Sequence, residues 1–408
     1  MGAEIQMTLP TAARSQKRRS VQSLASSALQ AAVGFWVGVA VVGQLMFAFT
    51  LASFYGMASA RGDLRAWNKG MSHGYVPGDA LGNLAVATHL MSAVIIILAG
   101  MVQLIPQIRE RAPAFHRWNG RLYMLTAFTI SLAGLYMMWG RGTVGDLAQH
   151  LGQSLNAVLI MLCAVMALRY AMARDFKTHR QWALRLYLVV SASLFIRAGL
   201  FFSLFLNPAG FGFDPTTFRG PFLTFLSFGQ YLVPLTVLEI YLRVKERGNA
   251  LGRFALAAGL FVLTMAMGAG IFAVTMGVWI PRVKAAYDSR KSIAEILSAS
   301  IATSGVDQAV KQYHELRNAT PATYNFDEDE LNTLGYEFIK AKKFEEAIRV
   351  FQLNVDAYPK SANTYDSLAE AYMDDGNTSQ AIVNYQKSLQ LNPKNRNAVQ
   401  MLEKLKAP

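Results

Sequence analysis

Apolar residues gather in seven long runs between residues 29 and 280, and short polar segments separate these runs. The runs lie at about 31–56, 83–105, 118–139, 148–171, 183–206, 222–242 and 254–280. A helix of about 20 mainly apolar residues crosses the hydrocarbon core of a bilayer, and every run meets that length. The pattern therefore predicts an all-α protein whose residues 29–284 form a polytopic membrane helix bundle of about seven spans.

Basic residues are concentrated in alternate loops of this bundle. Lys and Arg number 17 in the segment before the first run and in 106–121, 169–185 and 243–253, against five in 57–82, 140–147 and 207–221. The positive-inside rule therefore predicts a multi-pass protein of the cell inner (plasma) membrane, with residues 1–28 as a basic cytoplasmic segment. The first run is too long for the apolar region of a signal peptide, so we expect an uncleaved span. Seven crossings place the C-terminal domain outside the cytoplasm.

Charge divides the chain into two parts of different character. Residues 1–284 hold 25 Lys and Arg against 9 Asp and Glu, whereas residues 285–408 hold 14 against 17. We therefore attribute the sequence pI of 9.7 to loops that face anionic lipid headgroups. The expected partner of these basic loops is the lipid bilayer, and we expect no binding of nucleic acid. Cys163 is the only cysteine, which excludes an intramolecular disulfide and a CxxCH haem-attachment motif.

A strict 34-residue period appears in the C-terminal part of the chain. Apolar, small and proline residues of one copy have counterparts 34 residues later. The first copy contains Leu331, Leu334, Gly335, Phe338, Ala347, Phe351 and Pro359. At the matching positions the second copy contains Tyr365, Leu368, Ala369, Tyr372, Ala381, Tyr385 and Pro393. A degenerate earlier copy includes Ala309, Tyr313, Leu316 and Pro321. This period is the signature of stacked helix-turn-helix units, and it closely resembles the tetratricopeptide repeat family.

The resemblance implies that residues 285–408 form a tetratricopeptide-type α-solenoid with a concave face that binds a protein or peptide partner. A packing module that caps the membrane bundle or dimerises is the alternative. His314 is a lone histidine in this domain and is expected to be solvated.

Four of the six histidines fall near the ends of predicted spans. The predicted direction of the spans puts His89 and His150 towards the outer face and His116 and His179 towards the cytoplasmic face. His116 begins the motif His-Arg-Trp-Asn-Gly-Arg-Leu-Tyr, and His179 begins the similar motif His-Arg-Gln-Trp-Ala-Leu-Arg-Leu-Tyr. This repetition predicts a duplicated two-helix unit, so that residues 83–206 form a histidine-bearing four-helix core.

Two layers of histidines in a four-helix bundle suit haem b, which needs two neutral imidazoles on opposite sides of the iron. We expect His116 and His179 to hold an inner haem, and His89 and His150 to hold an outer one. A lipid-interface role for these residues is the simpler alternative, because aromatic and basic residues also mark the membrane boundary.

Three arginines are candidate partners for the haem propionates. Arg121 and Arg185 lie close to the inner histidines in sequence, and Arg197 is a charge within the fifth span. Arg197 follows His179 by 18 residues, about 27 Å along a helix, which places it near the outer pair. An intramembrane charge needs a partner because its burial is costly.

The arrangement is similar to the cytochrome b561 superfamily, in which four histidines on four consecutive helices hold two haems. A closer resemblance is to a bacterial membrane family, the domain of unknown function 2306. Residues that carry this resemblance are Thr88-His89, Pro113-Ala114-Phe115-His116-Arg117-Trp118-Asn119-Gly120-Arg121-Leu122-Tyr123, His179-Arg180-Gln181-Trp182, Arg185 and Arg197. His150 is not a usual mark of that family, so the outer pair departs from its pattern.

These features lead to a function hypothesis and its rivals. We expect di-haem electron transfer across the membrane, with a quinol or a small reductant as donor and no catalytic side chain. One rival is a non-enzymatic membrane anchor that displays the repeat domain to an envelope partner. Another is a transporter or lipid-handling protein, for which Gly229 and Pro234 in the sixth span are the only signal. Whether the protein is an enzyme stays open.

Overall fold

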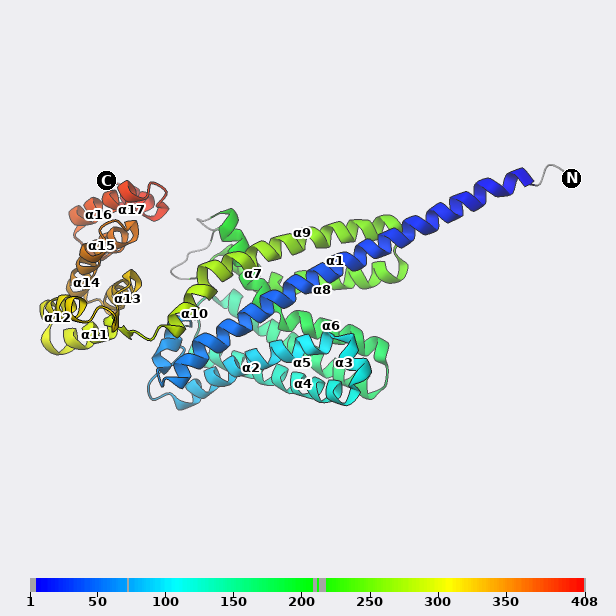
Figure 1. Cartoon of the computed structure of the whole chain (residues 1–408), viewed down its shortest axis with the longest axis horizontal. Helices are drawn as coiled ribbons and strands as arrows, with labels where there is room; N and C mark the ends of the chain where they lie inside the picture. The colour runs from blue at the N-terminus through cyan, green and yellow to red at the C-terminus, as the bar shows by residue number, and fades with distance from the viewer. Residues whose placement is uncertain (1–4, 72, 208–210, 213–217, 407–408) are drawn as a thin grey trace. The chain divides into compact units, whose positions relative to one another are not determined.

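The computed structural model describes residues 5–71, 73–207, 211–212 and 218–406, and these are helical over most of their length (Figure 1). The chain forms two compact units, Met1–Tyr287 and Asp288–Pro408. This confirms the all-α fold class, with an apolar bundle and a C-terminal repeat domain. The units meet at 287/288, close to the predicted boundary at 284/285.

Six helices in the described part of the chain are long and apolar enough to cross a membrane. They are α1 (Ile5–Ala60), α2 (Ala80–Leu104), α4 (Pro113–Tyr136), α5 (Leu147–Met172), α8 (Pro221–Arg247) and α9 (Ala250–Val274). The short π-helical segments η2 (Met137–Arg141) and η3 (Thr275–Trp279) continue α4 and α9, and α10 (Ile280–Tyr287) follows η3. The remaining short helices are η1 (Leu64–Lys69) and α3 (Pro106–Arg111).

The fifth predicted span is a broken helix. It consists of α6 (Phe176–Val190) and α7 (Ala192–Leu206), which are bent by 48°. Ser191 lies between them, and its hydroxyl donates to the carbonyl oxygen of Tyr187 at 2.7 Å while it accepts from Gln44 Nε2 at 2.6 Å. A serine that bonds the preceding turn and a neighbouring helix disturbs the backbone ladder and bends the helix. Counting this pair as one span gives the seven that the sequence predicts.

The basic N-terminal segment is not separate from the first span. From Ile5 onward it is helical and continuous with α1, which is 56 residues long. At 1.5 Å per residue α1 measures about 84 Å, far more than the ~30 Å hydrocarbon core.

The helices formed by residues 83–206 share one buried apolar cluster. Helix α2 packs along α4, α5 packs along α6, and α4 also contacts α5, while α1 and α9 pack together beside α7 (Figure 1). Buried side chains fill the centre of the core, among them Tyr123, Ala127, Cys163 and Leu186. Cys163 is 3% exposed and therefore serves as a small core residue.

The repeat domain contains three helical pairs and a closing helix. The pairs are α11 (Ile293–Ser304) with α12 (Val306–Ala319), α13 (Glu328–Lys340) with α14 (Phe344–Ala357), and α15 (Ala362–Asp374) with α16 (Thr378–Leu391), and α17 (Arg396–Lys406) closes the array. Two short parallel strands, β1 (Lys291–Ser292) and β2 (Tyr324–Asn325), were not predicted.

Small residues at the repeat positions allow the paired helices to approach closely. A Cβ atom on Gly335 would collide with the ring of Phe351 on the facing helix. The equivalent pair in the next repeat is Ala369 and Tyr385, and both are fully buried. The 34-residue period thus follows from the packing of one aromatic ring against one small residue in each unit.

Candidate functional site

Local capping places three of the histidines in the first turn of a helix. Asp146 accepts from the backbone N–H of Gln149 and begins α5, which puts His150 in its first turn. Asp175 accepts from the N–H of Thr178 and begins α6, which puts His179 in the same position. Pro113 begins α4, which carries His116. His89 differs because it lies well inside α2.

Two histidines, one in each predicted layer, present the same nitrogen to a backbone carbonyl. His89 Nδ1 lies 3.2 Å from the carbonyl oxygen of Ile130 on α4, and His179 Nδ1 lies 2.9 Å from that of Ala167 on α5. A carbonyl oxygen only accepts hydrogen bonds, so Nδ1 must carry the proton in both rings. In the neutral ring Nε2 then keeps its lone pair, which is the form of imidazole that ligates a metal.

His116 completes the inner layer. Its Nδ1 is buried and has no hydrogen-bond partner among the described residues. Its backbone carbonyl accepts from Gln103 Nε2 at 2.9 Å, which ties the start of α4 to α2. His179 begins α6 beside the last turns of α5, and α5 packs along α4. The structure therefore places His116 and His179 at the same end of the bundle, and their pairing stays a prediction.

The arginines of the duplicated motif stack on the tryptophans of the same motif. The Arg121 guanidinium lies 4.8 Å from the ring centroid of Trp118, and that of Arg185 lies 4.9 Å from the ring centroid of Trp182. This matched geometry supports the internal duplication. The two arginines differ in one respect, because Arg185 Nη2 lies 2.6 Å from Glu239 Oε1 on α8.

Glu239 was not singled out from the sequence, and it changes the expectation for Arg185. A guanidinium that already has a carboxylate partner is less available to a propionate. Arg121 has no carboxylate within 4 Å among the described residues, so it is the inner arginine that fits an anionic group. The one acidic residue inside the predicted sixth span, 222–242, was a signal that could have indicated this ion pair.

Arg197 lies on α7, in the second half of the broken fifth span. Its Nη1 donates to the carbonyl oxygen of Ser193 at 2.6 Å, and its guanidinium lies 4.5 Å from the ring centroid of Phe47. In the described part of the chain no carboxylate lies within 4 Å of it. A half-buried guanidinium within a span favours a nearby anion.

His150 has a different environment from the other three histidines. Its Nε2 lies 3.3 Å from Thr143 Oγ1 and 3.4 Å from the carbonyl oxygen of Val144, and its ring packs edge-on against Trp139. The imidazole is therefore held against the loop that precedes its own helix. In this arrangement Nε2 is engaged locally, and the pairing of His150 with His89 stays a prediction.

A polar cluster between the start of α2 and the end of η2 was missed. Arg141, whose side chain is 6% exposed, donates from Nη2 to Asn83 Oδ1 at 2.7 Å and lies 3.4 Å from Asp79 Oδ2 through Nε. Arg141 is the single basic residue of the predicted 140–147 loop, which was the available signal. The cluster ties the start of α2 to the end of η2 and so fixes this end of the core.

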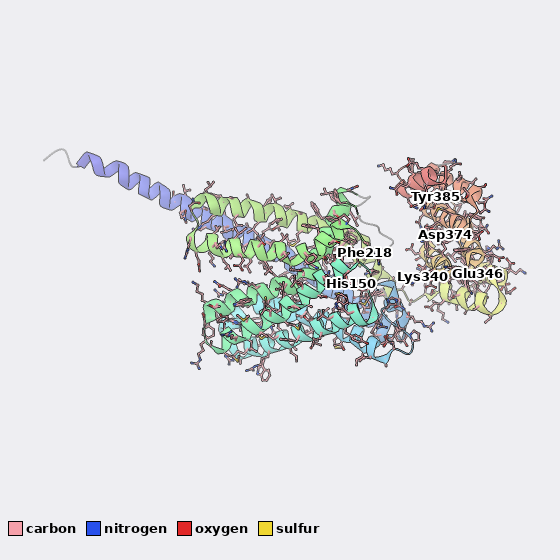
Figure 2. All side chains as sticks on the ribbon, turned by 180° about the vertical axis from the view of Figure 1, so that it is seen from behind. His150, Phe218, Lys340, Glu346, Asp374 and Tyr385 are labelled. Carbon is pink, nitrogen blue, oxygen red and sulfur yellow. The ribbon has the colours of Figure 1, made fainter. Side chains whose placement is uncertain are left out.

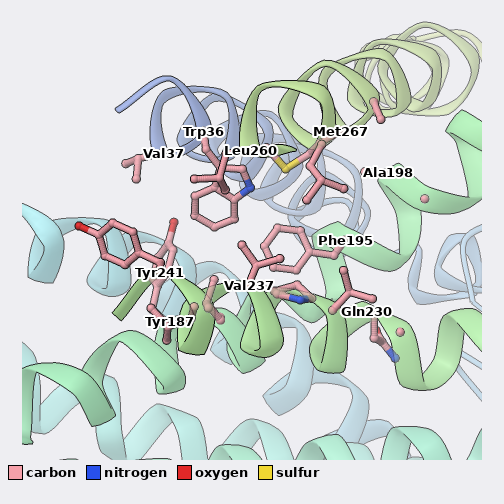
Figure 3. A pocket seen from close by; sticks show the side chains of 18 of the residues that line it. Trp36, Val37, Tyr187, Phe195, Ala198, Gln230, Val237, Tyr241, Leu260 and Met267 are labelled. Carbon is pink, nitrogen blue, oxygen red and sulfur yellow. The ribbon is translucent and has the colours of Figure 1, made fainter. Parts of the chain in front are cut away.

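An apolar cavity of about 390 Å³ lies between α1, α6, α7, α8 and α9 (Figure 3). Its lining includes Trp36, Tyr187, Phe195 and Tyr241, with Gln230 as a polar contributor. This volume is within the range of small-molecule pockets. None of the described histidines lines the cavity, so it is a feature separate from the two histidine layers.

Family models match two parts of the chain, and one of these parts contains the histidine-bearing helices. Residues 86–219 match the family model described as "Predicted membrane protein (DUF2306)". Residues 362–395 match the tetratricopeptide repeat model. The histidine core is thus similar to this family, and we refer to residues 86–219 as the DUF2306 region. Both resemblances drawn from the sequence are therefore confirmed.

The DUF2306 region contains His89, His116, His150 and His179 together with the three predicted arginines, whereas Glu239 lies outside it. No curated protein matches the chain. Among solved structures, the tetratricopeptide repeat domain of P58(IPK) is similar at 14% identity with a TM-score of 0.21, covering 90% of this chain and 97% of that one. At that TM-score the likeness carries no argument.

Proposed function

We propose that the DUF2306 region binds haem b in two layers and transfers electrons across the membrane. The observation that carries this proposal is the shared state of His89 and His179. Each donates Nδ1–H to a carbonyl oxygen of a neighbouring helix and leaves Nε2 free. A hydrogen bond of this kind fixes the ring orientation and raises the basicity of the ligating nitrogen.

The residues of the inner layer fit a haem. His116 and His179 would hold the iron through their ring nitrogens, and Arg121 would neutralise a propionate. Arg185 is less suited to that role, because Glu239 already neutralises it. The unpartnered Nδ1 of His116 also fits, because a buried ring nitrogen without a hydrogen bond is unusual unless the ring has another role. The haem would supply one-electron chemistry, while the helices position the ligands and exclude water.

The outer layer fits less completely. His89 offers a free Nε2, and Arg197 would neutralise a propionate beside it. His150 would have to turn its Nε2 away from Thr143 and Val144 to reach iron. Two redox centres at opposite faces would allow stepwise transfer across the ~30 Å core. We propose a quinol or a small reductant as the donor.

The orientation proposed for this protein follows from the loop charges and the span count. With the bent pair counted as one span, seven crossings put the N-terminus in the cytoplasm and the repeat domain outside it, in a plasma membrane. There the repeat domain would bind a protein or peptide partner. Protease accessibility of the C-terminus in intact cells tests this, and a cytoplasmic repeat domain would contradict it.

Haem content of purified variants tests the haem proposal. His116→Ala and His179→Ala should each remove the same haem, so the double variant should lose no more than either single variant. His314→Ala in the repeat domain is the matched control and should keep the wild-type content. Unchanged haem content in both bundle variants, or loss of different haems, would contradict the inner pair.

A membrane anchor that displays the repeat domain is the second candidate, and the tetratricopeptide match favours it. In this role the histidines would only stabilise helix contacts. The anchor predicts a colourless protein whose cellular function survives histidine substitution, whereas electron transfer predicts that the function fails.

A further inference from the structure

One face of α15 in the repeat domain carries three carboxylates. Asp366, Glu370 and Asp374 are spaced four residues apart, which places them on the same side of the helix. Asp366 accepts from the side-chain amides of Asn395 and Asn397 at 2.8 and 2.9 Å. We refer to Asp366, Glu370 and Asp374 as the acidic face.

The acidic face has no basic partner in direct contact. No Lys or Arg nitrogen lies within 4 Å of its carboxylates among the described residues. Glu370 is held by the Tyr336 hydroxyl, which donates to it at 2.7 Å. Burial raises the pKa of all three carboxyls, and only for Asp374 does a more distant cation, Lys404, oppose this effect.

A buried hydroxyl on α16 packs beside this helix. Tyr385 on α16 is fully buried, and its Oη has no hydrogen-bond partner in the described part of the chain. Tyr385 shares a buried cluster with Ala369, which lies on α15 between Asp366 and Glu370. Burial raises the pKa of the Tyr385 hydroxyl, and the charges of Glu370, Asp366 and Asp374 act in the same direction. Figure 2 shows Tyr385 and Asp374 on neighbouring helices of the domain.

Internal stability does not explain this arrangement. Like charges four residues apart destabilise a helix, and a buried hydroxyl without a partner carries a further cost. Each would be relieved by a cationic group, because carboxylates only accept hydrogen bonds, whereas ammonium and guanidinium groups only donate them. A tyrosine hydroxyl can accept from the cation or donate to a carboxylate that shifts towards it.

We propose that the acidic face of α15 binds a Lys or Arg side chain of an extended segment in a partner protein. The choice of a basic segment rests on charge complementarity with three carboxylates that lack a bound cation. This inference depends on the proposed partner-binding role of the repeat domain, and not on haem. The basic N-terminal segment of the chain itself is excluded by the proposed orientation, which places it on the other side of the membrane.

Peptide binding to the full-length protein in nanodiscs of zwitterionic phosphatidylcholine tests the proposal. The probe is a fluorescein-labelled peptide of about 12 residues in which Arg alternates with Ser, and the reference peptide has Glu in place of Arg. Fluorescence anisotropy should show saturable binding of the Arg peptide that weakens as salt rises. Zwitterionic lipid keeps the basic probe from binding the membrane itself.

Variants then locate the binding. Asp366→Asn and Glu370→Gln should each weaken binding of the Arg peptide by about fivefold or more, because each removes a carboxylate and keeps a hydrogen-bond acceptor. Glu345→Gln on α14 removes an exposed charge elsewhere in the domain and should leave binding unchanged. Tyr385→Phe should weaken binding by about threefold without lowering the unfolding temperature.

Equal affinity of wild type and both acidic-face variants would overturn the proposal. Binding of the Glu peptide in preference to the Arg peptide would overturn the basic specificity and leave partner binding intact. Failure of both peptides to bind would count against the partner-binding role as well. None of these results bears on the haem proposal, so the two can fail independently.

Discussion

The Nδ1 atom of His179 lies 2.9 Å from the carbonyl oxygen of Ala167, which joins the start of α6 to the end of α5. This contact sets the tautomer of the ring and leaves the lone pair on Nε2. A purely structural histidine and a metal-ligating histidine would both make this contact. Only a bond from Nε2 to iron would distinguish the two roles.

His179→Asn separates these roles. The Asn side-chain amide can donate to the carbonyl of Ala167 in place of Nδ1–H, but it offers no nitrogen lone pair to iron. We expect loss of the inner haem with an unfolding temperature of the haem-free protein close to that of the haem-free wild type. Thermal unfolding and haem content, measured on the same samples, check this. Retention of the haem would assign His179 a structural role only.

The ion pair of Arg185 and Glu239 should stabilise the contact between α6 and α8. Glu239→Gln should lower the free energy of unfolding by about 1 kcal/mol, since the pair is only partly exposed. Glu246→Gln is the matched control, because its partner Lys177 is 3.1 Å away and both side chains are exposed. Chemical unfolding in detergent compares the two. An equal effect from both variants would contradict the role of Glu239.

Close packing of α7 against α9 requires a glycine at 270. A Cβ atom there would collide with the backbone carbonyl of Ala198, which cannot move without shifting α7. Gly270→Ala should therefore destabilise the bundle by about 1–3 kcal/mol. Gly259→Ala lies on the same helix, and a Cβ atom there would have no neighbour within 4 Å. That control should be neutral or slightly stabilising, as Ala favours helix over Gly.

The acidic face of α15 predicts an unusual dependence of stability on pH. Burial raises the folded-state pKa of Glu370, so its contribution to stability is present below the unfolded-state pKa and is lost as pH rises through the folded value. Glu370→Gln should therefore raise the unfolding temperature of the repeat domain at about pH 7 and have a smaller effect near pH 4. Differential scanning calorimetry at both pH values measures this. A lower unfolding temperature at neutral pH would show that the charge stabilises the fold.

Most of the fold could be predicted because it depends on local patterns. The length of the apolar runs predicted the spans, and the 34-residue period predicted the paired helices around Gly335 and Phe351. The bend at Ser191 could not be predicted, because it depends on a hydrogen bond from Gln44, 147 residues away in sequence. Helix α11 was also missed, since it precedes the residues that keep the period.

The candidate site was predicted only in part, because some of its contacts join residues that are far apart in sequence. Histidine spacing placed His116 and His179 at the same end of the bundle, because both begin helices of a duplicated unit. The partner of Arg185 and the orientation of the His150 ring depend on tertiary contacts that spacing does not encode. The sequence therefore indicates which residues share a layer, and side-chain packing determines which of them face each other.

The optical spectrum of the purified full-length protein tests the central claim most directly. After expression with an adequate haem supply, the oxidised and then reduced protein should show the absorption bands of a low-spin b-type haem with two histidine ligands. We expect two haems per chain. A colourless protein under these conditions would contradict electron transfer and favour the membrane anchor.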